Sequence, residues 1–278
     1  MPDLPPQEIL AQFDIANPTF VERTALATVW KVVRDDGQAA ALNIYHGTDM
    51  RNEAFGFEML RGWAGRGAAH LYQKSANAAL IEWLGGISLG DLSRGGEDEK
   101  ANMHLVDIAN QLHSRALEPI PGIPTLDSWF SPLLCLRFAR TCPRQARKDL
   151  ENCKTLARDL LASQSDMVVL HGDLHHDNIR LGERGYCAFD AKGVLGERAY
   201  ELANAVRNPK GADKIVNNPH RIRRLLDSWA ASFAVDRRRL AQWAAVKCAL
   251  SIAWRASGPL ETDPEFELLS KLLHISQE

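Results

Sequence analysis

The segment from His171 to Ile179 concentrates the residues of this chain that could carry out chemistry. It reads His171-Gly172-Asp173-Leu174-His175-His176-Asp177-Asn178-Ile179, and Asp190 follows twelve residues after Asn178. A carboxylate such as Asp173 can accept the proton of an attacking hydroxyl. The oxygens of Asn178 and Asp190 suit Mg²⁺, which binds a few carboxylate or carbonyl oxygens together with the phosphates of a substrate. The spacing predicts a phosphoryl-transfer site with Asp173 as base and Asn178 and Asp190 as metal ligands.

Short strands are expected to position these three residues. Met167–Leu170 is an apolar run that would form a strand leading into the loop, and residues 178–181 would form a second strand. The turn 182–185 joins the second strand to residues 186–189, as in a β-hairpin. Asp190 then lies at the end of a hairpin that folds back toward Asp173.

The N-terminal part of the chain has the pattern of a small β-rich lobe. Residues 27–34 and 38–45 alternate as two strands around Asp35-Asp36-Gly37. Strands near 69–74 and 78–83 would extend the sheet, which has five strands if a first strand lies near 19–23 and fewer if it does not. A helix is expected between the strands at 38–45 and 69–74. Asp49 would be its N-cap, apolar residues continue at helical spacing through Trp63, and Gly65 and Gly67 would end it. The paired glycines in 85–90 mark the boundary between a lobe of residues 1–84 and a lobe of residues 85–278.

The second lobe is expected to be mainly helical. Apolar residues recur at three- and four-residue spacing in 97–116, 126–141, 144–163, 197–206, 219–233, 236–257 and 261–275. Asp236 and either Thr262 or Asp263 are candidate N-caps. Together the two halves predict an α+β fold with a small β-rich N-lobe and a larger helical C-lobe.

Two groups of side chains on these helices receive structural interpretations. Trp229, Trp243 and Trp254 recur on predicted helices and are interpreted as core residues. The arginines of 221–224 and 237–239 are interpreted as solvated helix faces. Neither group is assigned a functional role.

The motifs resemble those of the aminoglycoside phosphotransferase and protein-kinase-like family, and most closely those of its streptomycin and hydroxyurea phosphotransferase branch. That branch has a similar His-Gly-Asp-Leu-His-His segment, and four further segments fall in the expected order: Thr28-Val29-Trp30-Lys31-Val32, Glu82-Trp83-Leu84, Gln111-Leu112-His113 and Gly193-Val194-Leu195-Gly196-Glu197. The resemblance implies a bilobal protein-kinase-like fold. It also implies transfer of the γ-phosphoryl group of ATP, with Mg²⁺, to a hydroxyl of a small molecule such as the aminoglycoside streptomycin.

The resemblance further implies roles for individual residues. The segment 82–84 would be the hinge that contacts the adenine, and Glu53 would be the helix carboxylate that organises the small lobe. His171 would brace the catalytic loop, and His175 and His176 are interpreted as scaffold of the same loop.

The chain departs from the family where the nucleotide phosphates are normally held. Protein kinases carry a Lys on the third strand, which contacts the phosphates and pairs with a Glu on the following helix. Asn43 occupies the matching position here, so Glu53 lacks its usual partner. The phosphate loop 22–28 also contains no glycine, so small residues and hydroxyls would have to let its backbone approach a phosphate. Three explanations stay open: another cation replaces the strand-three Lys, nucleotide binding is weakened, or catalysis has been lost.

Lys31 and Lys192 are the candidates for a replacement cation. Lys31 lies on the preceding strand, where the two-residue period decides whether it faces the cleft. The resembling branch has a Lys there beside its strand-three Lys. Lys192 follows Asp190 by two residues, so it would lie near the phosphates or pair with Glu197 or Glu201.

Length and composition fit a two-lobed globular enzyme. The chain has 278 residues, 45% of them hydrophobic, and a formal net charge of −2, which favours no nucleic-acid partner. Its five cysteines form no Cys-x-x-Cys pair, and the first residues show no signal-peptide pattern. No apolar stretch of the sequence approaches the length that spans a membrane. A cytoplasmic protein with reduced thiols, a small-molecule substrate and no membrane partner is expected, and the oligomeric state is left open.

Two other interpretations stay open. The substitution at Asn43 would also suit a non-catalytic kinase-like protein that only binds nucleotide. A metal-dependent hydrolase would use the His and Asp side chains of the loop as zinc or di-metal ligands. The remaining six histidines, however, show no His-Glu-x-x-His spacing and no second cluster.

Overall fold

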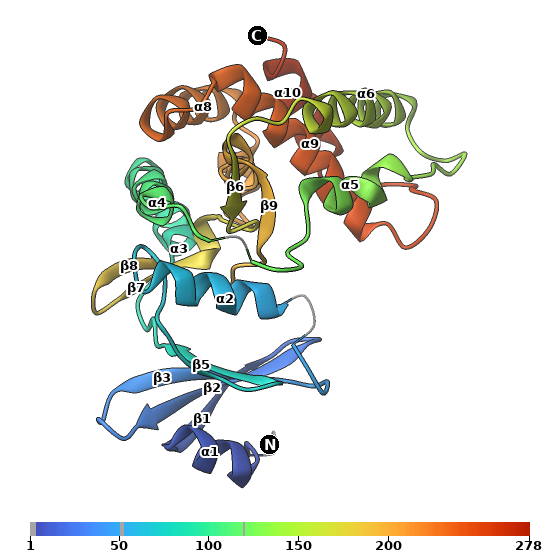
Figure 1. The fold of residues 1–278 in the computed structure, drawn as a ribbon. Helices are drawn as coiled ribbons and strands as arrows, with labels where there is room; N and C mark the ends of the chain where they lie inside the picture. The colour runs from blue at the N-terminus through green and yellow to red at the C-terminus, as the bar shows by residue number, and fades with distance from the viewer. Residues whose placement is uncertain (1–3, 51–52, 119) are drawn as a thin grey trace.

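The computed structural model describes residues 4–50, 53–118 and 120–278. Figure 1 shows a small lobe built on a sheet and a larger helical lobe, connected by residues 83–88. The predicted α+β fold with a β-rich first lobe is confirmed. The boundary predicted at residue 85 falls in this connection and stays a prediction. No helix within the described ranges is long and apolar enough to cross a membrane.

The sheet of the small lobe has five antiparallel strands in the order β1-β2-β3-β5-β4. They are β1 (Ile15–Arg23), β2 (Ala27–Arg34), β3 (Ala39–Tyr45), β4 (Leu71–Lys74) and β5 (Ala78–Glu82). The sheet predicted from the alternation is confirmed, although β1 begins at Ile15 rather than near residue 19. Val29 of β2 lies opposite Asn43 of β3, which directs both side chains to the same face of the sheet.

A short helix, α1 (Gln7–Phe13), covers the other face of this sheet. Its Leu10 and Phe13 pack against Trp30 and Val32 of β2. They form a small core on the side of the sheet away from the helical lobe (Figure 1). The sequence does not predict this helix, because two buried apolar residues are too few to reveal a helical period.

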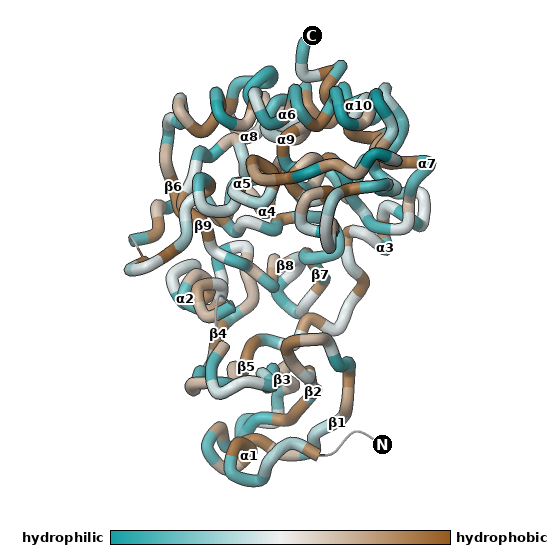
Figure 2. Tube along the Cα trace, turned by 90° about the vertical axis from the view of Figure 1, so that its right-hand side faces the viewer, coloured by the Kyte–Doolittle hydropathy of each residue, from teal (hydrophilic) through white to brown (hydrophobic). Residues whose placement is uncertain are grey.

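The helix α2 (Ala54–Trp63) lies between the sheet and the helical lobe, in both Figure 1 and Figure 2. Its N-cap is Glu53, so the prediction of Asp49 is wrong, and residues 51–52 between them lie outside the described ranges. Its end follows the prediction, because the chain takes left-handed backbone angles directly after Trp63, including at Gly65.

The helical lobe is built around α9, most of whose side chains are buried. Its helices are α3 (Leu89–Arg94), α4 (Asp98–His113), α5 (Leu126–Leu134), α6 (Arg144–Ala162), α7 (Asp213–Val216), α8 (Pro219–Phe233), α9 (Arg237–Arg255) and α10 (Phe266–Ile275). The long helices predicted over 97–116, 144–163, 219–233 and 236–257 are confirmed, with Asp236 as N-cap of α9. The helix predicted over 126–141 is shorter and ends at Leu134.

The helix predicted over 197–206 is wrong. This segment holds the last residue of β9 (Val194–Glu197) and short 3-10 turns. Its apolar residues are buried on every side, so their spacing reflects full burial rather than one face of a helix.

The last helix begins at Phe266 rather than near residue 261. Asp263 accepts hydrogen bonds from Arg255 and from the backbone N–H of Glu265, which holds the preceding loop against α9. Neither Thr262 nor Asp263 is therefore the N-cap.

The tryptophan prediction is confirmed at two of its three positions. Trp229 and Trp243 are both buried, and Trp243 has Phe130 and Tyr200 as aromatic neighbours. Trp254 is 46% exposed, which contradicts a core role for this residue. The reason is its place in the last turn of α9, where the helix emerges from the lobe.

The prediction of solvated arginine faces is wrong for two residues. Arg221 is 2% exposed, and its guanidinium binds both carboxylate oxygens of Asp98. Arg239 binds both oxygens of the buried Glu197. Each arginine joins elements far apart in sequence, which a charge run alone does not reveal.

Candidate active site

The segment His171–Ile179 lies between β6 (Met167–Leu170) and the hairpin of β7 (Ile179–Gly182) and β8 (Gly185–Ala188). β6 pairs with β9, and β7 pairs with β8 as predicted. A backbone hydrogen bond of 3.0 Å from Phe189 to Asn178 closes the hairpin. It returns the chain, and with it the residue that follows Phe189, to the catalytic loop.

His171 is buried and ties the loop together. Its Nδ1 accepts from the backbone N–H of Asp173 at 3.3 Å, and its Nε2 donates to the carbonyl of Phe189 at 3.0 Å. This pattern requires a neutral ring with the proton on Nε2, and burial lowers the pKa of His171, which favours that form. The ring also stacks on Trp63 of α2 at 5.9 Å between centroids. His171 thereby links the loop to α2 and to the segment that leads to Asp190.

Asp173 carries its carboxylate in an open part of the loop, with 29% of the side chain exposed. Asn204 Nδ2 donates to its Oδ1 at 2.7 Å, and Asn178 Nδ2 donates to its Oδ2 at 3.3 Å and to its carbonyl at 3.0 Å. These amides orient the carboxylate without neutralising it. Because the Nδ2 of Asn178 points to Asp173, its Oδ1 points to the other side, where it could bind a cation.

Glu201 anchors the start of the loop from a buried position. Its carboxylate accepts from the backbone N–H groups of His171 at 2.9 Å and Gly172 at 3.3 Å, and from Nε2 of His113 at 2.7 Å. Burial would raise the pKa of Glu201, but the hydrogen bond with His113 and the neighbouring groups outweigh it and lower the pKa. The carboxylate is therefore ionised at neutral pH. The Gln-Leu-His motif thus contributes the residue that holds Glu201.

The two other histidines of the loop have structural contacts. His175 Nδ1 accepts from the backbone N–H of Asp177 at 3.2 Å, and burial lowers the pKa of His175 to about 4. His176 is fully buried and donates to Oδ1 of Asn102 at 2.8 Å. Across residues 4–50, 53–118 and 120–278, no three His, Cys, Asp or Glu side chains form a set that could hold a metal ion. The hydrolase interpretation therefore has no ligand set in this part of the chain.

Lys192 forms an ion pair with Glu53, the residue that lacks its usual partner. The Nζ of Lys192 lies 2.8 Å from Glu53 Oε2 and 2.8 Å from Asp190 Oδ1. Burial alone would lower the pKa of Lys192, but the carboxylates of Asp190 and Glu53 outweigh it and raise the pKa above its usual value. The ammonium is therefore charged at neutral pH. The alternative partners, Glu197 and Glu201, are held by other side chains.

A close approach of α2 makes this ion pair possible. A Cβ at Gly56 would lie 1.8 Å from the carbonyl oxygen of Ala191, so no other residue fits at this position without moving the helix. On the opposite side, the backbone N–H of Lys192 donates to the carbonyl of His171 at 2.9 Å. Lys192 is thus held between α2 and the catalytic loop.

The ion pair lies in a cavity of about 370 Å³ between the lobes. Asn43 lines this cavity together with Glu53, Asp190 and Lys192, so the position of the missing strand-three Lys belongs to the same site. Apolar side chains form another part of the wall: Ala27, Val29, Leu60, Ile81 and Phe189. An apolar wall beside a charged group suits a nucleotide, because the base packs against apolar side chains and the phosphates bind a cation.

The loop between β1 and β2 closes the cavity without glycine. Thr24 Oγ1 accepts from the backbone N–H groups of Leu26 at 3.2 Å and Ala27 at 3.0 Å. These N–H groups are used inside the turn, so the expectation that this backbone approaches a phosphate is weakened. Among the described residues that line the cavity, Lys192 is the only cation.

The hinge segment does not direct its acidic side chain into the cavity. Glu82 accepts from Nε of Arg184 at 3.1 Å and from the backbone N–H of His70 at 3.1 Å. Leu84 packs with Phe189 in a separate small cluster. The Glu82 carboxylate therefore ties β5 to the turn of the catalytic hairpin, and an adenine contact from Glu82 would have to come from its backbone.

In the described part of the chain, Lys31 forms no ion pair with Glu53. Its neighbours Trp30 and Val32 point into the small core under α1. Because side chains alternate along a strand, Lys31 faces the opposite side of the sheet, toward the cleft. Its Nζ lies over the ring of Trp83, 5.2 Å from the centroid, at the hinge rather than at Glu53. Both residues lie outside the lining of the interlobe cavity.

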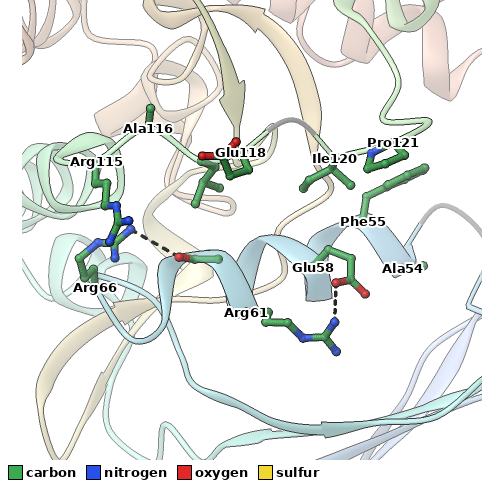
Figure 3. A pocket seen from close by; sticks show the side chains of 12 residues that line it. Ala54, Phe55, Glu58, Arg61, Arg66, Arg115, Ala116, Glu118, Ile120 and Pro121 are labelled. Carbon is green, nitrogen blue, oxygen red and sulfur yellow. Dashed lines mark hydrogen bonds and ion pairs between the residues drawn. The ribbon is translucent and has the colours of Figure 1, made fainter.

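A second cavity, of about 560 Å³, is lined by side chains of α2 that do not line the first cavity, and Figure 3 shows it. Phe55, Glu58 and Arg61 line it from α2, and Glu58 and Arg61 form an ion pair there at 2.7 Å. Residues 115–118 and 120–121 form its other wall. It contains none of the predicted site residues and is therefore separate from the phosphoryl-transfer site.

Sequence spacing does not identify Glu201 and Asn204 as parts of the site. Both lie in the irregular segment after β9, where no motif marks them. They are, however, the polar residues in the otherwise apolar run from Ala199 to Val206, and both are at most 3% exposed. Polar residues inside a buried run need partners, which is the signal that could have found them.

Residues 13–258 match the model of the aminoglycoside/hydroxyurea antibiotic resistance kinase family. The chain belongs to this family. The kinase is 34% identical over 208 residues to streptomycin 3''-kinase of Klebsiella pneumoniae, covering 73% of this chain and 76% of that protein. It is 25% identical over 228 residues to streptomycin 6-kinase of Streptomyces griseus, covering 80% and 73%. The microcompartment-associated aminopropanol kinase superposes with a TM-score of 0.62 at 15% identity, over 98% of this chain and 95% of the other, which shows a shared fold.

Family membership establishes the class of reaction. The kinase is an ATP-dependent phosphotransferase that acts on a hydroxyl of a small molecule. The predicted bilobal protein-kinase-like fold is confirmed. The interpretation as a metal-dependent hydrolase is set aside.

Proposed function

We propose that this kinase is catalytically active with Mg²⁺ and ATP, that Lys192 replaces the strand-three Lys, and that the acceptor is an aminoglycoside of the streptomycin type. The observation that carries the proposal is the 2.8 Å ion pair between Lys192 and Glu53 in the interlobe cavity. A cation beside a transferring phosphoryl group stabilises the charge that develops there. The substitution at Asn43 has therefore relocated this cation rather than removed it.

The residues of the site would have separate roles in phosphoryl transfer. Asp173 would accept the proton of the acceptor hydroxyl, and the amides of Asn204 and Asn178 would keep its carboxylate oriented. Lys192 would contact the phosphates, and Glu53 would hold Lys192 in place. The site thus contributes orientation and charge, which are the main needs of this reaction.

The donor set of the site fits Mg²⁺. The amide oxygen of Asn178 and the carboxylate of Asp190, whose side chain is 45% exposed, are the hard oxygen donors that this ion prefers. These two residues would hold the ion together with phosphate oxygens of ATP. When bound, the ion neutralises phosphate charge during the transfer.

The acceptor proposal rests on the relatives. Two of them are named for streptomycin. Four acidic residues of the helical lobe that could attract a polycation are already paired with Arg or Lys: Asp227, Asp263, Glu265 and Glu267. Using these carboxylates for the acceptor would break existing ion pairs, so other contacts must select the acceptor.

The central test is ATP-dependent phosphorylation of streptomycin by the purified protein, compared with Asp173→Asn. The substitution removes the base and its charge but keeps the shape, so turnover should fall by roughly 10²- to 10⁴-fold. Nucleotide binding should largely persist, because Asp173 acts on the acceptor side. Turnover within a few fold of the parent would refute the assignment of Asp173.

Asp190→Ala tests the metal site separately. ATP should raise the melting temperature of the parent more with Mg²⁺ than without it, because a ligand stabilises the state that binds it. Asp190→Ala should lose the Mg²⁺-dependent part of this shift. If Mg²⁺ changes the shift of neither protein, the proposed metal site is wrong.

A cytoplasmic location completes the proposal. All five cysteines are free, and four of them are buried. Unpaired thiols favour a reducing compartment. Recovery of the protein outside the cytoplasmic fraction of the producing cell would contradict this location.

A further inference from the structure

Lys247 is a buried lysine that the fold does not use for an ion pair. It lies on α9 and is 2% exposed. In the described part of the chain, its ammonium has no hydrogen-bond or ion-pair partner, and its contact is with the ring of Trp254, 4.3 Å from Nζ to the centroid. Charged groups are rarely buried without a partner, because burial removes their hydration.

The aromatic neighbours of Lys247 connect it to the catalytic loop. Trp254 meets Trp129 of α5 edge to face, with centroids 5.8 Å apart. Trp129 in turn lies against Gly172, where an added Cβ would be 2.8 Å from its ring. Trp129 and Trp254 thus extend from the residue before Asp173 to Lys247, and Trp254 is 46% exposed.

The charged groups around Lys247 make Asp173 its main counter-charge. Burial lowers the pKa of Lys247 to about 8, and among the neighbouring groups the carboxylate of Asp173 opposes this shift most strongly. Arg207 acts in the same direction as burial, whereas Cys248 and Glu265 oppose it. Glu265 already forms ion pairs with Arg207 and with Arg255, the last residue of α9. Asp173 is therefore the carboxylate that most favours the charged form of Lys247.

Stability does not explain a lysine at this position. Holding an unpaired ammonium in a buried site weakens the folded state, and such groups are typical of functional sites. A hydrophobic residue of similar length would pack at the same place without this penalty. A donor beside the base is useful, however, for a substrate whose hydroxyl must be presented to Asp173.

Resting on the proposed function, we propose that Lys247 binds the acceptor by donating a hydrogen bond to an oxygen next to the hydroxyl that Asp173 deprotonates. Trp254, which is 46% exposed, would stack on the ring that carries these groups. The acceptor class is therefore a polyhydroxylated, sugar-like ring.

Lys247→Met tests this assignment, with Lys148→Met on the exposed face of α6 as the matched control. The probes are streptomycin, myo-inositol and methyl glucoside, each assayed at saturating MgATP. A lost hydrogen bond from a charged group should lower kcat/KM for an accepted probe by roughly 10- to 100-fold, mainly through KM of the acceptor. The melting temperature of Lys247→Met at pH 7 should rise, which a merely structural residue would not show.

Trp254→Ala provides a second variant at a surface position, where a folding defect is not expected. It should raise KM for the same acceptor, because it removes the stacking face. If Lys247→Met matches Lys148→Met in KM, or if it lowers stability while KM stays unchanged, Lys247 is not an acceptor-binding residue.

The outcomes for the parent separate this inference from the proposed function. A parent that neither binds MgATP nor phosphorylates any probe refutes the proposed function itself. A parent that binds MgATP but accepts none of the three polyhydroxylated rings refutes the sugar-like acceptor class. A parent that accepts one of them, with Lys247→Met unimpaired, refutes only the role of Lys247.

Discussion

Moving the proposed phosphate-binding cation from Lys192 back to the third strand is the sharpest test of the nucleotide site. Lys192→Ala removes an ammonium that forms two ion pairs of 2.8 Å, with Glu53 and Asp190. A hydrogen bond that involves a charged group is typically worth about 1.5–3 kcal/mol, so the loss of one phosphate contact should weaken ATP binding by roughly 10- to 100-fold. Asn43→Lys alone should change little, because Glu53 already has a partner.

The double variant Lys192→Ala/Asn43→Lys carries the decisive expectation. Asn43 lines the same cavity as Glu53, so a Lys at this position can reach the carboxylate that Lys192 has left. Affinity for ATP and turnover should therefore recover by at least tenfold relative to Lys192→Ala. Adding Glu53→Ala should abolish most of this recovery, because the new Lys then lacks the carboxylate that positions it.

Isothermal titration calorimetry with MgATP and steady-state kinetics at varied ATP would measure both quantities. Lys148→Ala, on the exposed face of α6, is the control for loss of a surface lysine. The reasoning is refuted if Lys192→Ala keeps ATP affinity within threefold of the parent. It is also refuted if Asn43→Lys improves the parent as much as it improves Lys192→Ala, because Lys192 would then contribute no phosphate contact.

Three further predictions address the elements that position the site. Gly56→Ala should displace α2 from the carbonyl of Ala191, so ATP affinity should fall at least tenfold in calorimetry, whereas unchanged affinity would show that α2 can shift freely. Asn204→Ala should reduce kcat roughly 10-fold or more while KM for ATP stays within twofold, because it removes the 2.7 Å bond that orients Asp173. Lys247 has a folded-state pKa of about 8, below its unfolded value, so unfolding takes up a proton between the two values and its destabilising effect is complete below pH 8. The stability advantage of Lys247→Met in urea unfolding should therefore shrink by about 3 kcal/mol from pH 8 to pH 10.5, and a constant difference would contradict the buried charge.

The catalytic hairpin shows how far local sequence can predict a site. Asp173, Asn178 and Asp190 lie within one loop and one hairpin, so their spacing and the turn between β7 and β8 determine their arrangement almost without help from the rest of the chain. The five-stranded sheet is predictable for the same reason, since alternation and short turns define neighbouring strands. These contacts are local, and local contacts can be predicted from the spacing of apolar residues and turn residues along the sequence.

Helix termini and buried charges were less predictable. Arg221 and Arg239 lie in runs of arginine that resemble solvated faces, yet each binds a carboxylate on a distant element. The segment around Asn204 has helical spacing but forms short turns, because it is buried on all sides. In each case the sequence records that a residue is polar or apolar, but not which element packs against it.

The sequence by itself determined the catalytic loop, the order of the two lobes and the absence of a lysine at position 43. Only the tertiary structure decided which cation pairs with Glu53. Lys192 meets Glu53 across a separation of 139 residues, and this contact depends on how closely α2 packs against the segment after Asp190. The same holds for Lys247, whose buried contact with Trp254 lies where α9 packs against α5. Ion pairs and buried charges of this kind arise between elements far apart in the chain, so their energies depend on burial and distance, which spacing along a sequence does not contain.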